Sequence, residues 1–437
     1  MTTRHASVSA GIKLAYAAPA FALAVVGIPV YVYIPKFYTD TVGIDIALLG
    51  ALLLSVRIFD AITDPLLGRL SDHTRTRFGR RRPYIAVGSV LVALSMLMLF
   101  NPPRGGQLMA SLWFAVGIYA LFLFWTAVTV PYESLGPEIT FNYDERNTLF
   151  ALRDGALIAG TLVAAASPAL VRWLFGIPEG PSGERSVYFW ISVVYAPLVI
   201  GSCLWCFYAV RENTVHTRPA GKGAFWRDLR ATAGNRPFMI LLMAYTIAAV
   251  GNNLPATLIL YYVEYVLLSG HAELFLLIYF VTGIAFLPAW IGIARRMGKK
   301  RAWLASMAIN TGAFVGVFFL GPGDAAIYGV LVALSGIGFG ATLALPSSIQ
   351  ADVIDYDELL TCQRREGQYV GLWNIAKKLA AAVGVGAGLA ILGWAGYQPN
   401  VEQSAGVVFT LKVLYAGVPS LFNLIAFAIA LAYPIDG

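Results

Sequence analysis

The fold of this chain is decided by one stretch of sequence, Arg57-Ile-Phe-Asp60-Ala-Ile-Thr-Asp64-Pro-Leu-Leu-Gly68-Arg-Leu-Ser-Asp72-His-Thr-Arg-Thr-Arg-Phe-Gly79-Arg-Arg-Arg-Pro83. Its first half completes an apolar segment that begins near residue 47, and its second half is a short arginine-rich loop. About 20 apolar residues are enough for a helix to cross a bilayer, and basic residues collect in cytoplasmic loops. The stretch therefore predicts the cytoplasmic end of a membrane-spanning helix.

The same pattern of long apolar segments recurs along the whole chain of 437 residues. The composition is 58% hydrophobic and only 13% charged, about half the charged share of a soluble domain. Helices are the expected form, because isolated strands would leave backbone groups unpaired in lipid. Twelve segments are long enough to span, at residues 12–38, 47–70, 83–101, 109–137, 147–174, 187–210, 237–268, 272–294, 301–320, 325–351, 367–394 and 407–433.

The basic residues separate the two sides of the membrane. Loops around 40–46, 269–272, 321–324 and 395–406 carry no Lys or Arg. The loops that follow spans 2, 6 and 8 carry Arg69, Arg75, Arg77, Arg80, Arg81 and Arg82, then Arg211, Arg218, Lys222, Arg227, Arg230 and Arg236, then Lys299, Lys300 and Arg301. By the positive-inside rule both termini face the cytoplasm. The net charge of +7 thus reflects orientation in an inner membrane, and nucleic-acid binding is not expected.

Two halves of six spans are predicted, residues 1–210 and 237–437, joined by a cytoplasmic linker at 211–236. The basic loop after span 2 has a counterpart after span 8, where Gly292, Gly298 and Lys299 repeat its glycines and positive charge. Matching loops in two six-span halves favour a parallel repeat about an axis along the membrane normal. The chain is expected to be an all-α membrane protein of two six-helix bundles.

The loop motif resembles the glycoside–pentoside–hexuronide:cation symporter family, which includes melibiose permease. Tyr38-Thr39-Asp40, Pro131-Tyr132, and the run from Asp352 to Gly367 fit the same family. The likeness covers nearly the whole chain. It implies the major facilitator fold, alternating access and cation-coupled uptake.

Span 2 carries charges in its apolar length. Arg57, Asp60 and Asp64 lie at i, i+3 and i+7, which places them on one helix face. Two carboxylates one turn apart repel each other unless they share a cation or a proton. The pair therefore suits Na⁺ or H⁺. The alternative is an intramembrane salt bridge of Asp60 with Arg57 or with a lysine of span 11.

The resemblance implies further residues around this pair. Thr126 aligns with a hydroxyl that the family places beside the cation carboxylates. Lys378 aligns with a buried lysine next to the same acids, where it would hold the empty carrier neutral. Lys377 is its neighbour, and about 100° of helix rotation separates the two, so only one of them faces the cavity easily.

The same resemblance implies a substrate site, with two departures. Arg153 matches the family's arginine at the substrate cavity, although an ion pair with the adjacent Asp154 is an alternative role. Two acids that grip the sugar in melibiose permease are replaced here by Ala24 and Thr129, and Glu133 is new. A simple galactoside is therefore not expected, and an amphiphilic substrate such as a lysolipid is the alternative.

Four more residues are candidate substrate contacts. Trp125 and Trp373 are placed to stack on a sugar ring or line an apolar site, although lone tryptophans commonly pack or sit at the interface. Asn252 and Asn253, in the middle of span 7, are expected to line the cavity. Their alternative role is hydrogen bonding between helices, worth about 0.6 kcal/mol on average.

A cytoplasmic gate is expected from the acidic run that ends span 10, which includes Asp352 and Asp355. We expect these acids to pair with the basic loops at 75–82 or at 295–296. The predicted gate residues are Asp72, Arg80, Arg81, Arg296, Asp352 and Asp355.

The predicted function is symport of a sugar or glycoside-like solute with Na⁺ or H⁺, by alternating access. An amphiphile carrier and a proton-coupled exporter of the same fold are the alternatives. An enzyme is not expected, because the histidines form no H-x-x-H cluster. Cys203 and Cys206 lie in an apolar span and suit packing better than redox chemistry. No cofactor or bound metal beyond the coupling ion is expected, and the expected state is a monomer.

Overall fold

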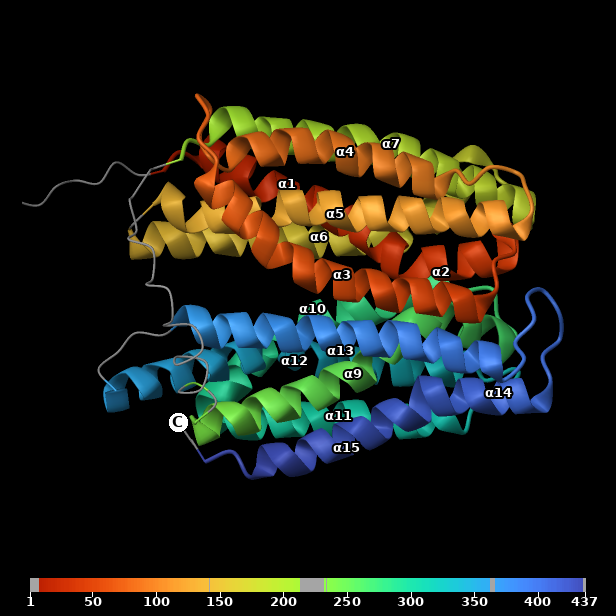
Figure 1. The fold of residues 1–437 in the computed structure, drawn as a ribbon. Coiled ribbons are helices and arrows are strands. Elements are labelled where there is room, and N and C mark those ends of the chain that lie inside the picture. The colour runs from red at the N-terminus through yellow and green to blue at the C-terminus, as the bar shows by residue number, and fades with distance from the viewer. Residues whose placement is uncertain (1–7, 141, 213–231, 233, 362–365, 435–437) are drawn as a thin grey trace, which may run out of the picture. The chain divides into compact units, whose positions relative to one another are not determined.

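Long helices make up nearly all of the computed structural model, and those of each unit run roughly side by side (Figure 1). The structure describes residues 8–140, 142–212, 232, 234–361 and 366–434. The chain divides into two compact units, Met1–Asp45 with Ile58–Thr217 (unit 1) and Ile46–Arg57 with Arg218–Gly437 (unit 2). Of the basic residues predicted in the linker and before span 11, Arg218, Lys222, Arg227, Arg230, Arg364 and Arg365 lie outside the described residues. The linker bounds 211–236 stay a prediction.

Unit 1 contains the first six spans, apart from the first part of span 2. Its first span runs without a break from Ala10 to Val42 and includes two π-helical segments, which widen the helix locally. The elements are α1 (Ala10–Ile28), η1 (Pro29–Tyr33), α2 (Ile34–Lys36), η2 (Phe37–Val42), α3 (Ile46–His73), α4 (Arg82–Phe100), α5 (Gln107–Ile139), α6 (Tyr143–Phe175) and α7 (Pro181–Ala209).

Unit 2 contains the last six spans and the first turns of α3. Its final span again includes a π-helical segment. The elements are α9 (Arg236–Tyr265), α10 (Ala272–Met297), α11 (Lys299–Phe318), α12 (Ala325–Thr361), α13 (Glu366–Trp394), α14 (Ala405–Lys412), η3 (Val413–Gly417) and α15 (Val418–Leu431).

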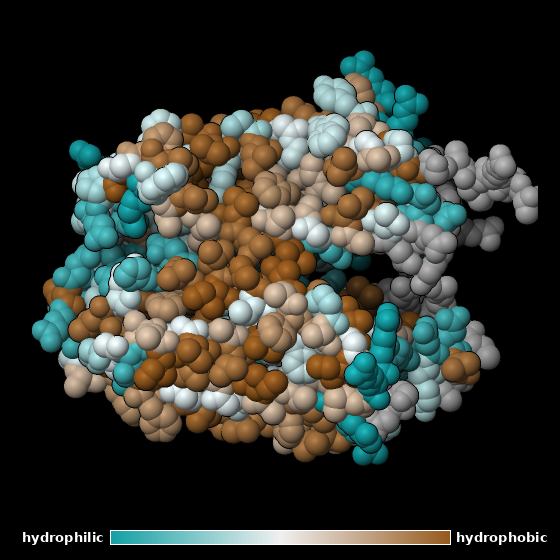
Figure 2. All heavy atoms as spheres, turned by 180° about the vertical axis from the view of Figure 1, so that it is seen from behind, coloured by the Kyte–Doolittle hydropathy of each residue, from teal (hydrophilic) through white to brown (hydrophobic). Residues whose placement is uncertain are grey.

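Each of the twelve predicted spans coincides with one of these helices or continuous helical runs, within the part of the chain that the structure describes. Eleven of the described helices are long and apolar enough to cross a membrane. The twelfth, α11, has 20 residues and opens with Lys299-Lys300-Arg301. On the face drawn in Figure 2, apolar side chains gather over the middle of the helices and hydrophilic ones toward their ends. The predicted all-α membrane fold is confirmed.

The largest difference from the predicted bounds is at α12. The helix continues to Thr361, whereas the apolar segment ends near residue 351. Apolar length measures only the part of a helix that lies in hydrocarbon, so a polar extension is invisible to it. Asp352 and Asp355, expected at the end of span 10, therefore lie on the same helix as the span.

Close helix contacts in unit 1 rest on a glycine of α6. A Cβ atom on Gly160 would lie 2.4 Å from the Phe21 carbonyl oxygen and 2.9 Å from the Ala24 Cβ. The backbones of α1 and α6 therefore meet near Ala24. Tyrosine hydroxyls add bonds between helices, from Tyr33 to the Ala165 carbonyl at 2.7 Å and from Tyr132 to the Tyr16 carbonyl at 2.6 Å.

Replacing Gly160 by valine should destabilise the protein by about 1–3 kcal/mol, because overpacking forces the helices apart. The matched control is Gly155→Val on the same helix, where an added Cβ meets nothing within 4 Å. Thermal unfolding of both variants in detergent measures the difference. Equal stability of the two variants would contradict the contact between α1 and α6.

Candidate functional site

The centre of the candidate site is a carboxylate on α3. Asp60 is only 6% exposed, and Asp64 is partly buried one turn further along the same helix. Residues four apart lie on one face of a helix, so both carboxylates lie on the same side of α3. Arg57, three residues before Asp60, is also partly buried. The structure thus places the predicted pair where charge is costly and a partner is needed.

Thr126 on α5 supplies a partner. Its Oγ1 donates a hydrogen bond of 2.7 Å to Oδ1 of Asp60, and the threonine side chain is 1% exposed. Two predicted site residues that are 66 positions apart, both in unit 1, therefore meet. A hydroxyl and carboxylates together offer the oxygen ligands that hard cations prefer. The same atoms also suit a shared proton.

Arg153 is held on α6 by its immediate neighbour. Its Nε donates to Oδ1 of Asp154 at 2.8 Å, and its guanidinium lies 4.8 Å from the centre of the Phe150 ring. Asp154 itself is exposed. The ion pair is the alternative role weighed for this arginine, but one guanidinium has five N–H donors, so further acceptors can still bind it.

Three further predicted residues of α5, all near Thr126 in the sequence, have different surroundings. Thr129 donates to the carbonyl of Trp125 at 3.0 Å, which occupies its hydroxyl proton within its own helix. Glu133, one turn further, is exposed. Trp125 helps to line a small apolar cavity of ≈ 10 Å³ with Tyr31, Phe122 and residues of the first span. That volume holds about one water molecule, so this cavity is not a substrate pocket.

In unit 2 the two predicted lysines of α13 differ in burial, since Lys377 is exposed and Lys378 is partly buried. Trp373, on the same helix, is 6% exposed and stacks on Tyr245 with ring centres 4.0 Å apart. The indole face is therefore covered by a tyrosine of α9, which is the packing role expected of many lone tryptophans.

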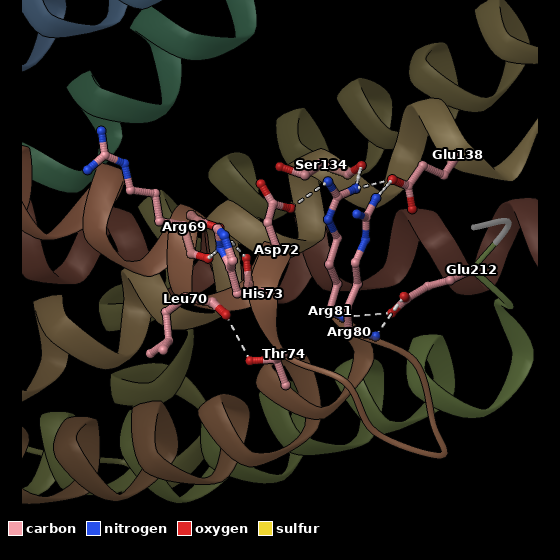
Figure 3. A network of polar contacts seen from close by, with 12 residues as sticks. Arg69, Leu70, Asp72, His73, Thr74, Arg80, Arg81, Ser134, Glu138 and Glu212 are labelled. Carbon is pink, nitrogen blue, oxygen red and sulfur yellow. Dashed lines mark hydrogen bonds and ion pairs between the residues drawn. The ribbon is translucent and has the colours of Figure 1, made fainter. Parts of the chain in front are cut away.

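Residues 74–82, which we call the arginine loop, form a polar network with α3, α5 and Glu212 (Figure 3). Arg80 and Arg81 both pair with Glu138 of α5, with 2.8 Å between Arg81 Nη1 and Glu138 Oε1. Arg81 also contacts Asp72 of α3 at 3.1 Å and donates to the Ser134 carbonyl. Three predicted gate residues are thus brought together.

Glu212, just beyond α7, binds the backbone of the same loop. Its carboxylate accepts hydrogen bonds of 2.8 Å from the N–H groups of Arg80, Arg81 and Arg82. Gly79 has φ +105°, and a Cβ there would lie within 2.8 Å of the Glu212 carboxyl atoms. This position therefore requires glycine, both for its left-handed backbone and for the close approach of the carboxylate.

The acidic end of α12 pairs inside unit 2. Asp352 accepts from Lys299 at 2.7 Å, with both side chains about two-fifths exposed. Asp355 and Arg296 are exposed. The partner of Asp352 is thus a lysine next to the predicted arginines at 295–296. An exposed pair of this kind contributes about 0–1 kcal/mol.

Comparison with known proteins shows the family of this chain. A family model described as MFS/sugar transport protein matches residues 15–437. The chain belongs to this family, the glycoside–pentoside–hexuronide:cation symporters. It is therefore a transporter, not an enzyme, and a multi-pass protein of the inner membrane. The predicted family and class of function are confirmed.

Its relatives and structural neighbours agree with this placement. The chain is 29% identical over 411 residues to the glucuronide carrier protein homolog of Escherichia coli (strain K12), covering 92% of this chain and 88% of the carrier. It is 27% identical to the isoprimeverose transporter of Lactiplantibacillus pentosus, covering 92% and 84%. A crystal structure of the nucleoside transporter NupG matches its fold with a TM-score of 0.67 at 14% identity, covering 97% of this chain and all of that one.

Two glutamates of this symporter were missed by sequence reasoning. Glu138 and Glu212 lie at helix ends, where an acid usually has a solvated or topogenic role. The one available signal was the local density of charge, because five arginines at 75–82 need counter-charges close by. Nothing in the sequence indicated that the counter-charges come from positions 58 and 130 or more residues away.

Asn252 takes part in hydrogen bonds between helices of unit 2. Its Oδ1 accepts from Nδ2 of Asn423 at 3.1 Å and from Nδ2 of Asn310 at 3.4 Å. Asn310 in turn accepts from Ser335 at 2.7 Å. The four side chains tie α9 to α11, α12 and α15. Asn252 thus has the alternative role stated for the asparagine pair, hydrogen bonding between helices. Asn253 donates within α9, to the Ala249 carbonyl.

We expect Asn252→Ala to destabilise the symporter by about 1–3 kcal/mol, because buried amide donors on Asn310 and Asn423 lose their acceptor. Asn253→Ala is the matched control and should cost less, since its bond stays within one helix. Thermal unfolding of each variant in detergent compares them. A control that is as destabilised as Asn252→Ala would refute the importance of the network.

Proposed function

We propose that this symporter carries a sugar or glycoside-like solute together with Na⁺ or H⁺, and that Asp60, Asp64 and Thr126 form the coupling site. The observation that carries the proposal is the 2.7 Å bond between Thr126 and the buried Asp60. A carboxylate in the interior of a spanning helix is costly. A buried carboxylate that accepts a hydrogen bond from a hydroxyl on a second helix is what binding of a cation or proton requires.

The coupling follows from electrostatics. Asp60 and Asp64, one turn apart on α3, repel each other when both are charged. A bound Na⁺ or a proton relieves that repulsion and stabilises the arrangement that binds solute. The bound solute in turn raises the affinity for the ion, because linkage between two ligands is reciprocal. The roles of Lys378 and Lys377 as charge partners, and of Arg57, stay predictions.

For the substrate we favour an acidic sugar or glycoside. Ala24 and Thr129 stand where melibiose permease has acids, so the carboxylates that would repel an anion are gone. Arg153 remains, and a guanidinium binds a carboxylate in bidentate fashion. Relatives named for glucuronide and isoprimeverose support a sugar-like substrate. We further propose a monomer with both termini in the cytoplasm and no cofactor.

The test is thermal stabilisation of the purified protein by solutes, with and without Na⁺ and at two pH values. The panel contains p-nitrophenyl glucuronide, the matching uncharged glucoside, and a lysophospholipid. Wild type should be stabilised by the glucuronide only when Na⁺ or acid pH is supplied. Asp60→Asn should lose the ion effect, by at least tenfold in the required ion concentration, equivalent to about 1.4 kcal/mol.

The other outcomes of this experiment would contradict parts of the proposal. Stabilisation by the uncharged glucoside alone would overturn the acidic substrate, and stabilisation by the lysophospholipid alone would favour the amphiphile. A solute effect that ignores both Na⁺ and pH, in wild type as in Asp60→Asn, would remove the coupling role of Asp60 and Asp64.

Thr126 offers a finer test of the same site. Thr126→Ser keeps the hydroxyl and should bind the ion within about threefold of wild type. Thr126→Val keeps the shape but removes the oxygen, and hydrogen bonds to charged groups are worth about 1.5–3 kcal/mol. We expect at least a tenfold weaker ion response, measured as the half-maximal concentration for stabilisation. Equal responses of the two variants would show that the hydroxyl is not a ligand.

A further inference from the structure

The arginine loop sits at one end of the two helices that form the coupling site. Asp60 and Asp72 both belong to α3, and Thr126 and Glu138 both belong to α5. In each helix twelve residues separate the two positions, a rise of about 18 Å. The helices run in the same direction (Figure 1). They are therefore joined at two levels, once by Thr126 and Asp60 and once by Arg81 between Asp72 and Glu138.

The second of these contacts, made by Arg81, is well suited to hold α3 and α5 at a fixed distance. Arg81 is 8% exposed, and its planar guanidinium reaches Asp72, Glu138 and the Ser134 carbonyl together. A planar fork with several donors holds its acceptors in defined directions. Lysine, with a single ammonium on a flexible stem, does not hold three acceptors in this way.

Glu212 fixes the backbone from which Arg81 extends. It accepts the N–H groups of three consecutive residues, 80–82, and so closes the start of α4. The cap residue of that helix has no side-chain bond of its own to these groups. The Arg82 side chain binds the C-terminal end of α7, since its Nε donates to the Phe207 carbonyl at 2.8 Å. The loop is thus anchored by its backbone to Glu212 (Figure 3) and by the Arg82 side chain to α7.

We propose that Arg81 and Glu212 are positioning residues for ion coupling, because together they hold α3 and α5 at the spacing that the bond between Thr126 and Asp60 requires. Neither residue touches the ion. The inference rests on the proposed coupling role of Asp60. It assigns Glu212 a part in ion affinity, through contacts that lie entirely in unit 1.

The experiment measures the Na⁺ concentration, and separately the pH, at which stabilisation of the purified full-length protein is half-maximal. Glu212→Gln loses the charge and one acceptor oxygen, and Arg81→Lys keeps the charge but not the fork. We expect three- to tenfold weaker Na⁺ or H⁺ affinity in Glu212→Gln, and a smaller loss in Arg81→Lys than in Arg81→Ala. Glu179→Gln, in an exposed loop of the same unit, should match wild type.

A merely structural role would lower the starting unfolding temperature and leave the half-maximal ion concentration unchanged. That result in Glu212→Gln and Arg81→Lys, with wild type responding and Asp60→Asn not, would overturn the inference while the coupling site stands. If wild type and Asp60→Asn respond alike, the coupling site fails and the inference falls with it. Should Arg81→Ala not fold, Glu212→Gln and Arg81→Lys still decide the matter.

Discussion

A carboxylate inside a membrane-spanning helix is tolerated only beside a partner, and in this protein that constraint acts on Asp60. A charge at the centre of a span costs about 2.5–3.5 kcal/mol on insertion scales. Asp60 meets this cost with the hydroxyl of Thr126, at 2.7 Å. The bond requires α3 and α5 to stay aligned, so the loops and helix ends that hold these two helices become part of the site.

Most of the fold was predictable because hydrophobic length is a local property. Apolar windows located the spans, and the charges of Asp60 and Asp64 stood out against them. Thr126 was predictable only through the resemblance, since one threonine in an apolar helix has no signature. The polar end of α12 was missed, because helix continues there after the apolar residues stop.

The remaining residues depend on distant pairing, which a single sequence does not contain. Asn310 and Asn423 meet Asn252 across 58 and 171 positions. Glu212 meets the arginine loop across about 130. Each looks unremarkable in its own segment, as an amide in a span or an acid at a helix end. Their importance arises from three-dimensional proximity, and in lipid the unsatisfied alternative is costly.

The equal spacing of the two joints between α3 and α5 has a consequence for how this chain can change over evolutionary time. One residue inserted between Asp60 and Asp72 would turn Asp72 by about 100° around its helix and shift it by about 1.5 Å. Arg81 would then lose its hold on α3 while keeping it on α5. Insertions and deletions should therefore be excluded from both segments, even where the side chains within them are apolar and touch neither joint.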